Sequence, residues 1–426
     1  MENNAEYKWK DFRAPRGTKD MLPKDASRWY QIERSVREVA ELLCYGEIRT
    51  PAFENAQLFD RAVGTETDIV SKEMFRIQTR MENEEGESFA LRPELTAPVV
   101  RAAIEHGLLT GQSDLLRLYY NSAASFRYEK PQKGRLRQFH QFGTELLGSA
   151  SPEADAETIR FAILVFQKLG LSNFEVRLNT LLSATPSSIW RLKLQTYLRE
   201  HMNMLSQDSQ HRVMVNPMRV LDSKAPEDQE IIRKAPRITD TEYLSGDDKS
   251  HFESVQELLK VAGIPFKLDP FLVRGIDYYT RTVFEITSTD LGAQDALCGG
   301  GRYDNLIEQL GGPRTPAIGF GAGVERLIIA LESKEQKIAK PSATFVATSY
   351  PTLYAITQSP LAGLKAFEVI SSLTSSAISA TADLNNRSMK AQMREANKAN
   401  AKFVYIIGES ELAEGAGILK DMQSGE

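Results

Sequence analysis

The sequence predicts an α+β protein with a large antiparallel-sheet domain, a helical insertion within it, and a small C-terminal α/β domain. Strand-like, glycine-punctuated segments flank a polar, helix-rich stretch at residues 183–266, which we interpret as the insertion. Residues 333–341 are polar, rich in lysine and end on proline, as is typical of a linker. Helix-like and strand-like pieces alternate after it. The predicted domains are therefore residues 1–332 and 342–426.

The overall composition is that of a globular protein. The 426 residues are too many for one ordinary domain and allow two or three. Hydrophobic residues make up 42% and charged residues 26%, which suits a soluble chain with a core of normal size. The formal net charge of −5 excludes a polycation. Any nucleic acid must therefore be bound by local basic patches.

The cysteine, histidine and N-terminal patterns predict a cytoplasmic protein without a structural metal. Only Cys44 and Cys298 are present, whereas a secreted protein of this size usually has several cysteine pairs. The five histidines form no zinc-binding spacing. Residues 1–10 are polar rather than a signal peptide, and no apolar run approaches the roughly 20 residues that span a bilayer.

The first predicted element is a helix at residues 32–43. Apolar residues recur there at intervals of four, three and four, which places them on one face. Gly46 ends this helix, and residues 47–51 read as a short strand. A core helix explains the pattern, and contact with a partner protein requires further evidence.

Residues 91–96 precede a second predicted helix. Thr96 fits the N-cap of that helix, and Pro98 fits an early helical position. A simple helix start therefore accounts for both residues. It does not account for Glu94, a lone carboxylate just before the helix.

Residues 125–147 predict an antiparallel hairpin with a basic tip. Residues 125–129 and 137–147 read as strands, and the loop between them contains proline and glycine. Along the returning strand, one face carries Arg137, Phe139, Gln141, Gly143 and Glu145, and the other carries Phe142 and Leu146. The first face suits a polar ligand that Arg127 could also reach. Patterning alone equally permits an exposed, solvated hairpin.

Three further segments could carry chemistry. Residues 272–281 place two arginines and two tyrosines before a strand, which fits a binding turn or packed tyrosines beside surface arginines. The glycine-rich runs at 298–303 and 319–327 let backbone approach a ligand or another strand. Neither run is a P-loop or has the context of a dinucleotide fold. Arg326, at the start of a predicted helix, indicates a nearby phosphate.

The last candidate is a basic helix at residues 387–402. Its helical period places Arg387, Lys390, Arg394, Lys398 and Lys402 on one face, and Met389, Met393 and Ala396 on the opposite face. Such a helix can meet a phosphate backbone. A solvated lysine-rich face explains the same pattern.

Together these segments occur in the order that one family shows. Residues 47–51 (EIRTP) are similar to class II motif 1, residues 126–141 to motif 2, and residues 319–327 to motif 3. The strings LVRGIDYYTRTVFE (272–285) and CGGGRYDNL (298–306) are those of the histidine-specific branch. From about residue 15 to about residue 420, the chain thus resembles the histidine-specific class II aminoacyl-tRNA synthetases.

This resemblance implies a fold, an activity and a set of partners. The implied fold is an antiparallel-sheet catalytic domain with a helical insertion, plus a C-terminal α/β anticodon-binding domain. The implied activity is histidine–tRNA ligase, with ATP and L-histidine as substrates and tRNA(His) as acceptor. The family further implies Mg²⁺ with the ATP phosphates, a homodimer formed through motif 1, and no structural metal or membrane partner.

For ATP, the resemblance assigns five residues. Arg127 would hold the α-phosphate, Arg326 the γ-phosphate end, and Arg274 would lie across the α-phosphate and stabilise the transition state. Phe139 would stack on adenine and Glu129 would contact its amino group. The histidine carboxylate must attack the α-phosphate, so two anions meet and the site needs cations.

For histidine, the resemblance assigns five more residues. Glu94, Thr96 and Gln141 would receive the α-ammonium group, and Glu145 and Tyr279 would bracket the imidazole nitrogens. A site that hydrogen-bonds both ends of the ring rejects apolar isosteres, because unmatched buried polar groups are costly.

For tRNA, the resemblance assigns the motif 2 loop and the C-terminal domain. Gln132, Lys133 and Arg135 would reach the acceptor end. The anticodon would be read by residues 342–426, with Arg387 and Lys390 among the contacts.

Three alternatives remain. A non-catalytic paralogue of this family regulates ATP phosphoribosyltransferase, but typically lacks the C-terminal domain and the three arginines present here at 127, 274 and 326. A synthetase for proline or threonine is disfavoured by Glu145 and Tyr279. A generic RNA-binding protein needs neither the arginines nor the glycine-rich motif.

Overall fold

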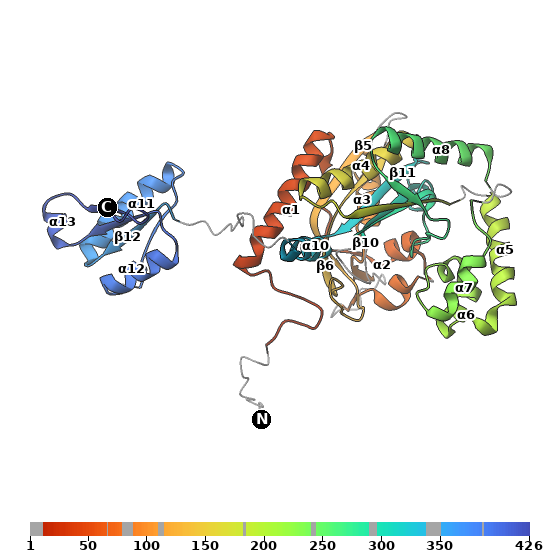
Figure 1. The fold of residues 1–426 in the computed structure, drawn as a ribbon, viewed down its shortest axis with the longest axis horizontal. Helices are drawn as coiled ribbons and strands as arrows, with labels where there is room; N and C mark the ends of the chain where they lie inside the picture. Colours follow the sequence, from red (N-terminus) through yellow and green to blue (C-terminus); the bar gives the residue numbers. More distant parts are fainter. Residues whose placement is uncertain are drawn as a thin grey trace, which may run out of the picture. The chain divides into compact units, whose positions relative to one another are not determined.

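The computed structural model describes residues 12–65, 67–78, 88–109, 115–181, 185–239, 244–288, 296–337, 351–385 and 387–426 (Figure 1). The chain divides into two compact units, one of Met1–Met21 with Arg28–Ala343 and one of Leu22–Ser27 with Thr344–Glu426. Helix α10 (Val324–Lys337) extends into the segment that we expected to be a linker. The rest of that segment, residues 338–341, lies outside the described residues.

An eight-stranded sheet forms the centre of the large unit. Its order is β1 (Gly46–Glu47), β5 (Leu116–Phe126), β6 (Gln138–Leu147), β11 (Ala317–Gly323), β10 (Ala296–Arg302), β9 (Thr280–Ser288), β7 (Phe174–Thr180) and β8 (Phe266–Leu268). Only the outermost pairs, β1–β5 and β7–β8, are parallel. The remaining pairs are antiparallel, which confirms the predicted sheet.

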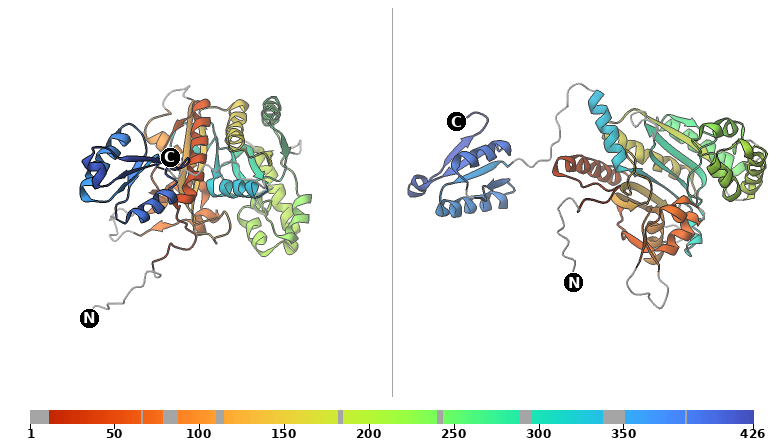
Figure 2. Two further views of the ribbon diagram at one scale, coloured as in Figure 1. Left: turned by 60° about the vertical axis from the view of Figure 1, so that its left-hand side comes forward. Right: turned by 90° about the horizontal axis from the view of Figure 1, so that it is seen from below.

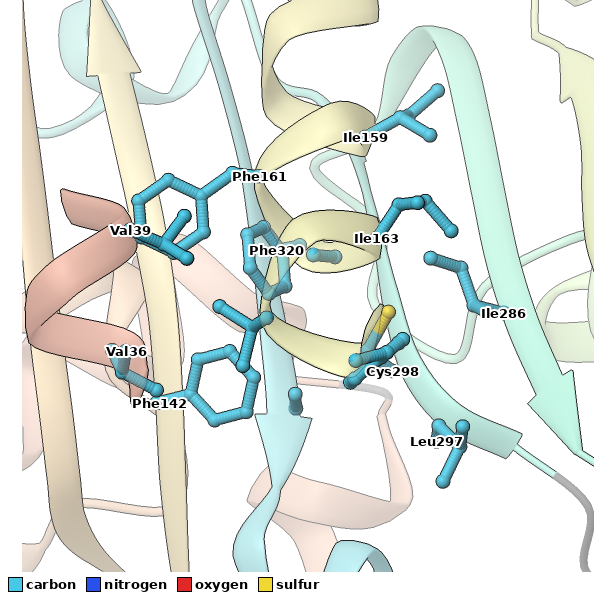
Figure 3. Packing of buried hydrophobic residues seen from close by; sticks show 14 of the residues in the cluster. Val36, Val39, Phe142, Ile159, Phe161, Ile163, Ile286, Leu297, Cys298 and Phe320 are labelled. Carbon is cyan, nitrogen blue, oxygen red and sulfur yellow. The ribbon is translucent and has the colours of Figure 1, made fainter. Parts of the chain in front are cut away.

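The main hydrophobic core lies between this sheet and helices α1 (Pro23–Leu42), α4 (Pro152–Lys168) and α8 (Gly246–Val261). Val36 and Val39 of α1 belong to this cluster together with Phe142 and Phe161 (Figure 3). The ring of Phe142 contacts that of Phe320 edge to face at 5.9 Å. The predicted core helix and the predicted apolar face of the hairpin are both confirmed.

A second cluster packs on the opposite face of the sheet. Successive strand residues point to opposite faces, and Leu146 belongs to the main core whereas Leu147 belongs to this cluster. Its further elements are α2 (Ala56–Phe59), the π-helical turns η2 (Asp60–Gly64) and η3 (Ile69–Glu73), α3 (Thr96–Glu105), α9 (Leu306–Gln309), and the small sheet of β2 (Phe53–Asn55), β4 (Phe89–Leu91) and β3 (Arg76–Ile77).

The helical insertion has a core of its own and is shorter than predicted. It contains α5 (Thr185–Glu200), η4 (Met202–Met204), α6 (Gln207–Val215), η5 (Pro217–Val220) and α7 (Pro226–Lys234), which form a separate lobe of the large unit (Figures 1 and 2). Helix α8 instead buries Phe252 and Val255 in the main core, so it does not belong to the lobe. A polar composition marks exposed helices, but it does not say which core their apolar side joins.

The small unit is an α/β domain, as predicted. Its sheet has the order β13 (Ala380–Ala382), β12 (Leu353–Thr357), β14 (Phe403–Ile407) and β15 (Ile418–Asp421). Helices α11 (Pro360–Ser375), α12 (Met389–Lys398) and α13 (Glu409–Ala413) complete it. Across the described parts of both units, every helix is too short or too polar to cross a membrane.

Candidate active site

A cavity of about 200 Å³ opens where β6, β10 and β11 meet the loop of the hairpin. Glycines form its floor, since Gly299 of β10 pairs with Gly321 of β11 across the sheet. Its walls carry Arg127, Glu129, Arg135, Phe139, Gln141, Arg274, Glu325 and Arg326. Four arginines therefore meet in one cavity, although they lie far apart in the sequence.

Arg127 and Phe139 lie on the two arms of the hairpin, two positions out of register, since Phe139 pairs with Ser125. The guanidinium of Arg127 lies 5.5 Å from the centroid of the Phe139 ring. Its Nε donates a hydrogen bond of 2.9 Å to the carbonyl of Pro93. The hairpin thus presents a held cation beside an aromatic ring, which suits a planar, anionic ligand.

Arg326 lies in the first turn of α10. Its Nη1 donates to the carbonyl of Ala296 at 2.8 Å and its Nε to that of Gly134 at 3.3 Å. Burial lowers the pKa of Arg326. A buried cation at the positive end of a helix is unfavourable by itself, so the site is prepared for an anion.

Arg274 lies across the cavity between β9 and β10. Its Nη1 forms an ion pair of 2.7 Å with Oε1 of Glu285. A Cβ on Gly299 would overlap its guanidinium, so this glycine makes the room that the arginine occupies. Burial opposes the charge of Arg274, but Tyr279 and Glu285 hold its pKa above the usual value. Sequence reasoning missed Glu285, although it lies within the 272–285 motif.

Glu94, rather than Thr96, caps helix α3. The Glu94 carboxylate accepts hydrogen bonds from the backbone N–H groups of Thr96 at 2.8 Å and Ala97 at 2.9 Å. Leu95 is the N-cap residue by position, and Thr96 is already helical. The predicted capping role of Thr96 is therefore wrong. Its hydroxyl donates instead to Oε1 of Glu145, at 2.8 Å.

Glu145 lies at the centre of a buried polar cluster. Its side chain is fully buried, and its second carboxylate oxygen accepts a hydrogen bond from the Tyr303 hydroxyl. A Cβ on Gly319 would overlap that oxygen. Burial raises the pKa of Glu145 to about 8. Sequence reasoning missed Tyr303; its only signal was its place at the end of the glycine-rich run.

Replacing Glu145 with glutamine should change how stability depends on pH. The folded pKa of about 8 lies above the ordinary value of 4.5, so between these values the folded chain binds more protons than the unfolded chain. This group's contribution to stability therefore falls as pH rises from about 4.5 to 8. We expect the unfolding midpoint of the wild type to fall, relative to that of Glu145→Gln, as pH rises over this range. A constant difference between pH 5 and pH 8 would contradict the raised pKa.

Tyr279 and Gln141 connect this cluster with the cavity. The ring of Tyr279 lies 4.8 Å from that of Tyr278, and burial raises its pKa. Gln141 lines the cavity and accepts a hydrogen bond of 3.3 Å from the Ser125 hydroxyl. The predicted ligand residues therefore fall into two neighbouring groups: Gln141 and the arginines line the cavity, and the buried carboxylates lie behind them.

The three hairpin-loop residues predicted to touch nucleic acid lie in two different environments. Arg135 forms an ion pair of 2.5 Å with Glu129 and lines the cavity. Burial raises the pKa of Glu129. Gln132 and Lys133 are exposed at the tip. Arg135 thus belongs to the wall of the cavity, whereas the other two residues reach solvent.

In the small unit, the predicted basic face is only partly present. Helix α12 begins at Met389, so Arg387 precedes it and Lys402 follows it. Arg387 donates to Asp383 at 2.7 Å and lies 3.4 Å from Glu395. Its charge is therefore balanced by carboxylates. The exposed basic residues at helical spacing are Lys390, Arg394 and Lys398.

Comparison with known proteins identifies close relatives. The family model described as "Histidyl-tRNA synthetase" matches residues 17–327, and "Anticodon binding domain" matches residues 360–426. A histidine–tRNA ligase from Chloroherpeton thalassium is 48% identical, over 97% of this chain and 94% of that protein. One from Caldanaerobacter subterraneus subsp. tengcongensis is 45% identical, over 97% and 96%.

Solved structures are also similar to this chain over most of its length. The apo histidyl-tRNA synthetase of S. aureus has a TM-score of 0.78 and 33% identity, over 97% of this chain and 96% of that chain. A Bacillus halodurans protein described as an ATP phosphoribosyltransferase regulatory subunit/histidyl-tRNA synthetase has a TM-score of 0.64 and 24% identity, over 93% and 98%. The second likeness shows the shared fold alone.

Proposed function

The chain belongs to the histidyl-tRNA synthetase family, and we propose from this premise how its site acts as a histidine–tRNA ligase. The enzyme activates L-histidine with ATP to histidyl-adenylate and pyrophosphate, then transfers histidine to the 3′ end of tRNA(His). The observation that carries the proposal is the cavity in which Arg127, Arg274 and Arg326 meet beside the buried Glu145.

The three arginines suit the first chemical step. The histidine carboxylate attacks the α-phosphorus of ATP, and pyrophosphate leaves. Arg127 holds the α-phosphate, Arg326 the outer phosphates, and Arg274 stabilises the charge that develops between them. Phe139 stacks on adenine, and Glu129 accepts from its amino group. Support comes from their common position around one cavity.

Mg²⁺ would accompany the ATP phosphates, whose negative charge it reduces. The cavity fits a polyphosphate, since its lining includes four arginines. The carboxylates of Glu129 and Glu285 already pair with Arg135 and Arg274 in this structure. The ion would therefore be held mainly by phosphate oxygens and water.

The histidine pocket is proposed at the buried carboxylates. Glu94, Thr96 and Gln141 receive the α-ammonium group, while Glu145 and Tyr279 contact the imidazole. Thr96 donates to one oxygen of Glu145, and Tyr303 donates to the other. In its ionised form this carboxylate offers about four acceptor sites, so it retains capacity for a substrate N–H.

The tRNA contacts are proposed at two places. Gln132 and Lys133 at the exposed hairpin tip would meet the acceptor end, with Arg135 at the cavity wall. In the small unit, Lys390 would meet the anticodon stem through its exposed side chain. The contact of Arg387 with tRNA stays a prediction. Asp383 and Glu395 already balance the charge of this arginine.

A homodimer is proposed through the surface around β1. A cavity of about 460 Å³ there is lined by Arg49, Tyr120 and neighbouring residues. Within the described chain, the buried Asn121 Oδ1 and Ser122 Oγ have no hydrogen-bond partner, and Ser122 has a φ of 46°. A second copy would supply the missing partners. Light scattering should give twice the chain mass of 47.7 kDa, and a monomer at micromolar concentration would contradict the proposal.

The cellular site of action is proposed to be the cytoplasm. Its support comes from the two cysteines, Cys44 and Cys298, which are both free thiols. A reducing compartment preserves such thiols.

The decisive experiment is ATP–pyrophosphate exchange with each of the twenty amino acids. We expect exchange with histidine alone, because Glu145 and Tyr279 are matched to imidazole. Exchange with proline or threonine would assign another specificity. Absence of exchange in a folded protein would favour a binding function like that of the regulatory paralogue.

Replacing Gly299 with alanine should displace the side chain of Arg274 while leaving that residue unsubstituted. The new methyl group would overlap the guanidinium, which must leave its place above β10. We expect the kcat of exchange to fall by about a hundredfold, the cost of a displaced catalytic group. Gly275→Ala is the matched control, because its Cβ would meet nothing within 4 Å. Equal kcat values for both variants would contradict the assigned position of Arg274.

A further inference from the structure

The loop of residues 272–279 packs against both the core of the helical insertion and the cluster on the second face of the sheet. It leads into β9 and carries both Arg274 and Tyr279. Its first residues, Leu272 and Val273, are buried in the core of the helical insertion. Tyr278 at its end is buried in the cluster of α2, α3 and α9, and Tyr279 packs against both clusters. The place of Arg274 therefore depends on how the insertion sits against the rest of the large unit.

Asp277 makes the polar connection between this loop and the insertion. Its Oδ1 accepts a hydrogen bond of 2.8 Å from Nδ2 of Asn216. Nη2 of Arg219 lies 3.5 Å from the same oxygen. Both donors belong to the segment that forms η5, so one carboxylate ties the loop to one turn of the insertion.

Asn216 is held in the orientation that this contact needs. Its side chain is 4% exposed, and its Oδ1 accepts from the backbone N–H of Met218 at 3.2 Å, which caps η5. The carbonyl end of the amide therefore faces η5 and the amino end faces Asp277. A hydrogen bond to a charged acceptor at this distance is among the stronger ones.

Apolar packing joins the start of the loop to the insertion, whereas Asp277 joins it by polar contacts. A cavity of about 280 Å³ lies between the insertion and the loop, lined by Trp190, Asn216 and Arg219 on one side and by Asp277 and Tyr279 on the other. Across an open space of this kind, dispersion contacts are few. The polar contacts of Asp277 thus join the loop to the insertion beside this cavity.

We propose that Asp277 is a positioning residue that ties the 272–279 loop to the insertion, so that the placement of the insertion sets the activation of histidine. The inference rests on the proposed function, in which Arg274 and Tyr279 contact the substrates. A ligand or substitution that moves η5 would change the geometry at Arg274. By reciprocity, substrates that order the loop would also order the insertion.

The test replaces the donor that faces Asp277. Asn216→Asp keeps a side chain able to cap η5, but places a second carboxylate against Asp277. We expect the kcat of histidine-dependent exchange to fall by about tenfold to a hundredfold, because small displacements of catalytic groups have effects of this size. The KM for histidine should rise, since Tyr279 moves with the loop.

The double variant Asn216→Asp/Asp277→Asn distinguishes positioning from general damage. It restores one amide and one carboxylate in exchanged places, so we expect kcat to recover most of the loss. Lys234→Ala is the control within the insertion, because Lys234 pairs with Glu230 on α7 itself. It should show the wild-type kcat and KM.

Three results would overturn the inference. The first is an unchanged kcat and KM in Asn216→Asp, and the second is a loss of kcat that the double variant does not recover. If Asn216→Asp fails to fold, the third is a wild-type kcat in folded Asp277→Ala. Wild-type protein without any exchange would overturn the proposed function itself, and this inference with it.

Discussion

Arg274→Ala should lower the kcat of histidine-dependent exchange by about a hundred- to a thousandfold, the range found when one transition-state stabiliser is removed. Arg274 faces the cavity between Glu285 and Gly299, where it can meet the α-phosphate from the side opposite Arg127. Charge accumulates on that phosphate only as the new bond forms. The loss should therefore appear in kcat.

Histidine binding should change much less in this variant. Calorimetric titration with histidine alone should give an affinity within a few-fold of wild type, because Glu145 and Tyr279, the proposed contacts of the imidazole, remain. Arg274→Lys should recover little, since an ammonium group does not reproduce the two-pronged geometry of a guanidinium. Lys260→Ala, which removes an exposed lysine paired with Glu257 on α8, serves as the control. Equal activity in Arg274→Ala would remove this residue from the mechanism.

The second large effect is expected from Glu145→Gln. We expect kcat/KM for histidine to fall by about 10⁴, as when a site built to hydrogen-bond a polar substrate loses that match. The glutamine amide cannot accept from Thr96, Tyr303 and imidazole together, because one of its ends only donates. One donor in the fully buried cluster is then left without an acceptor.

Tyr303→Phe is the informative companion to this variant. It removes one hydrogen bond to Glu145 and keeps the carboxylate itself. We expect a smaller loss, about tenfold in kcat/KM, from poorer orientation of that carboxylate. A lower kcat/KM in Tyr303→Phe than in Glu145→Gln would contradict the assignment of Glu145 as the direct imidazole partner.

Much of the fold and the candidate site could be predicted from local sequence. A period of two along residues 137–147 separates Gln141 and Glu145 from the core residues Phe142 and Leu146, and the structure shows this division. The helical period at residues 32–43 similarly predicts the buried face of α1. Such patterns are readable because a residue's direction in a strand or helix follows from its position alone.

Other features depended on residues distant in the sequence. Tyr303 meets Glu145 across 158 positions. The end of the insertion depended on which core buries the apolar side of α8.

The sequence by itself determined the two-part α+β architecture, the family and the three predicted arginines that line the candidate site. Only the tertiary structure decided that Glu94 caps α3, that Thr96 and Tyr303 hold Glu145, and that Asp277 reaches Asn216. The physical reason is that hydrogen bonding and burial are pairwise properties. A residue's type states what it can donate or accept, whereas the folded chain decides which partner is within reach and how much water is excluded.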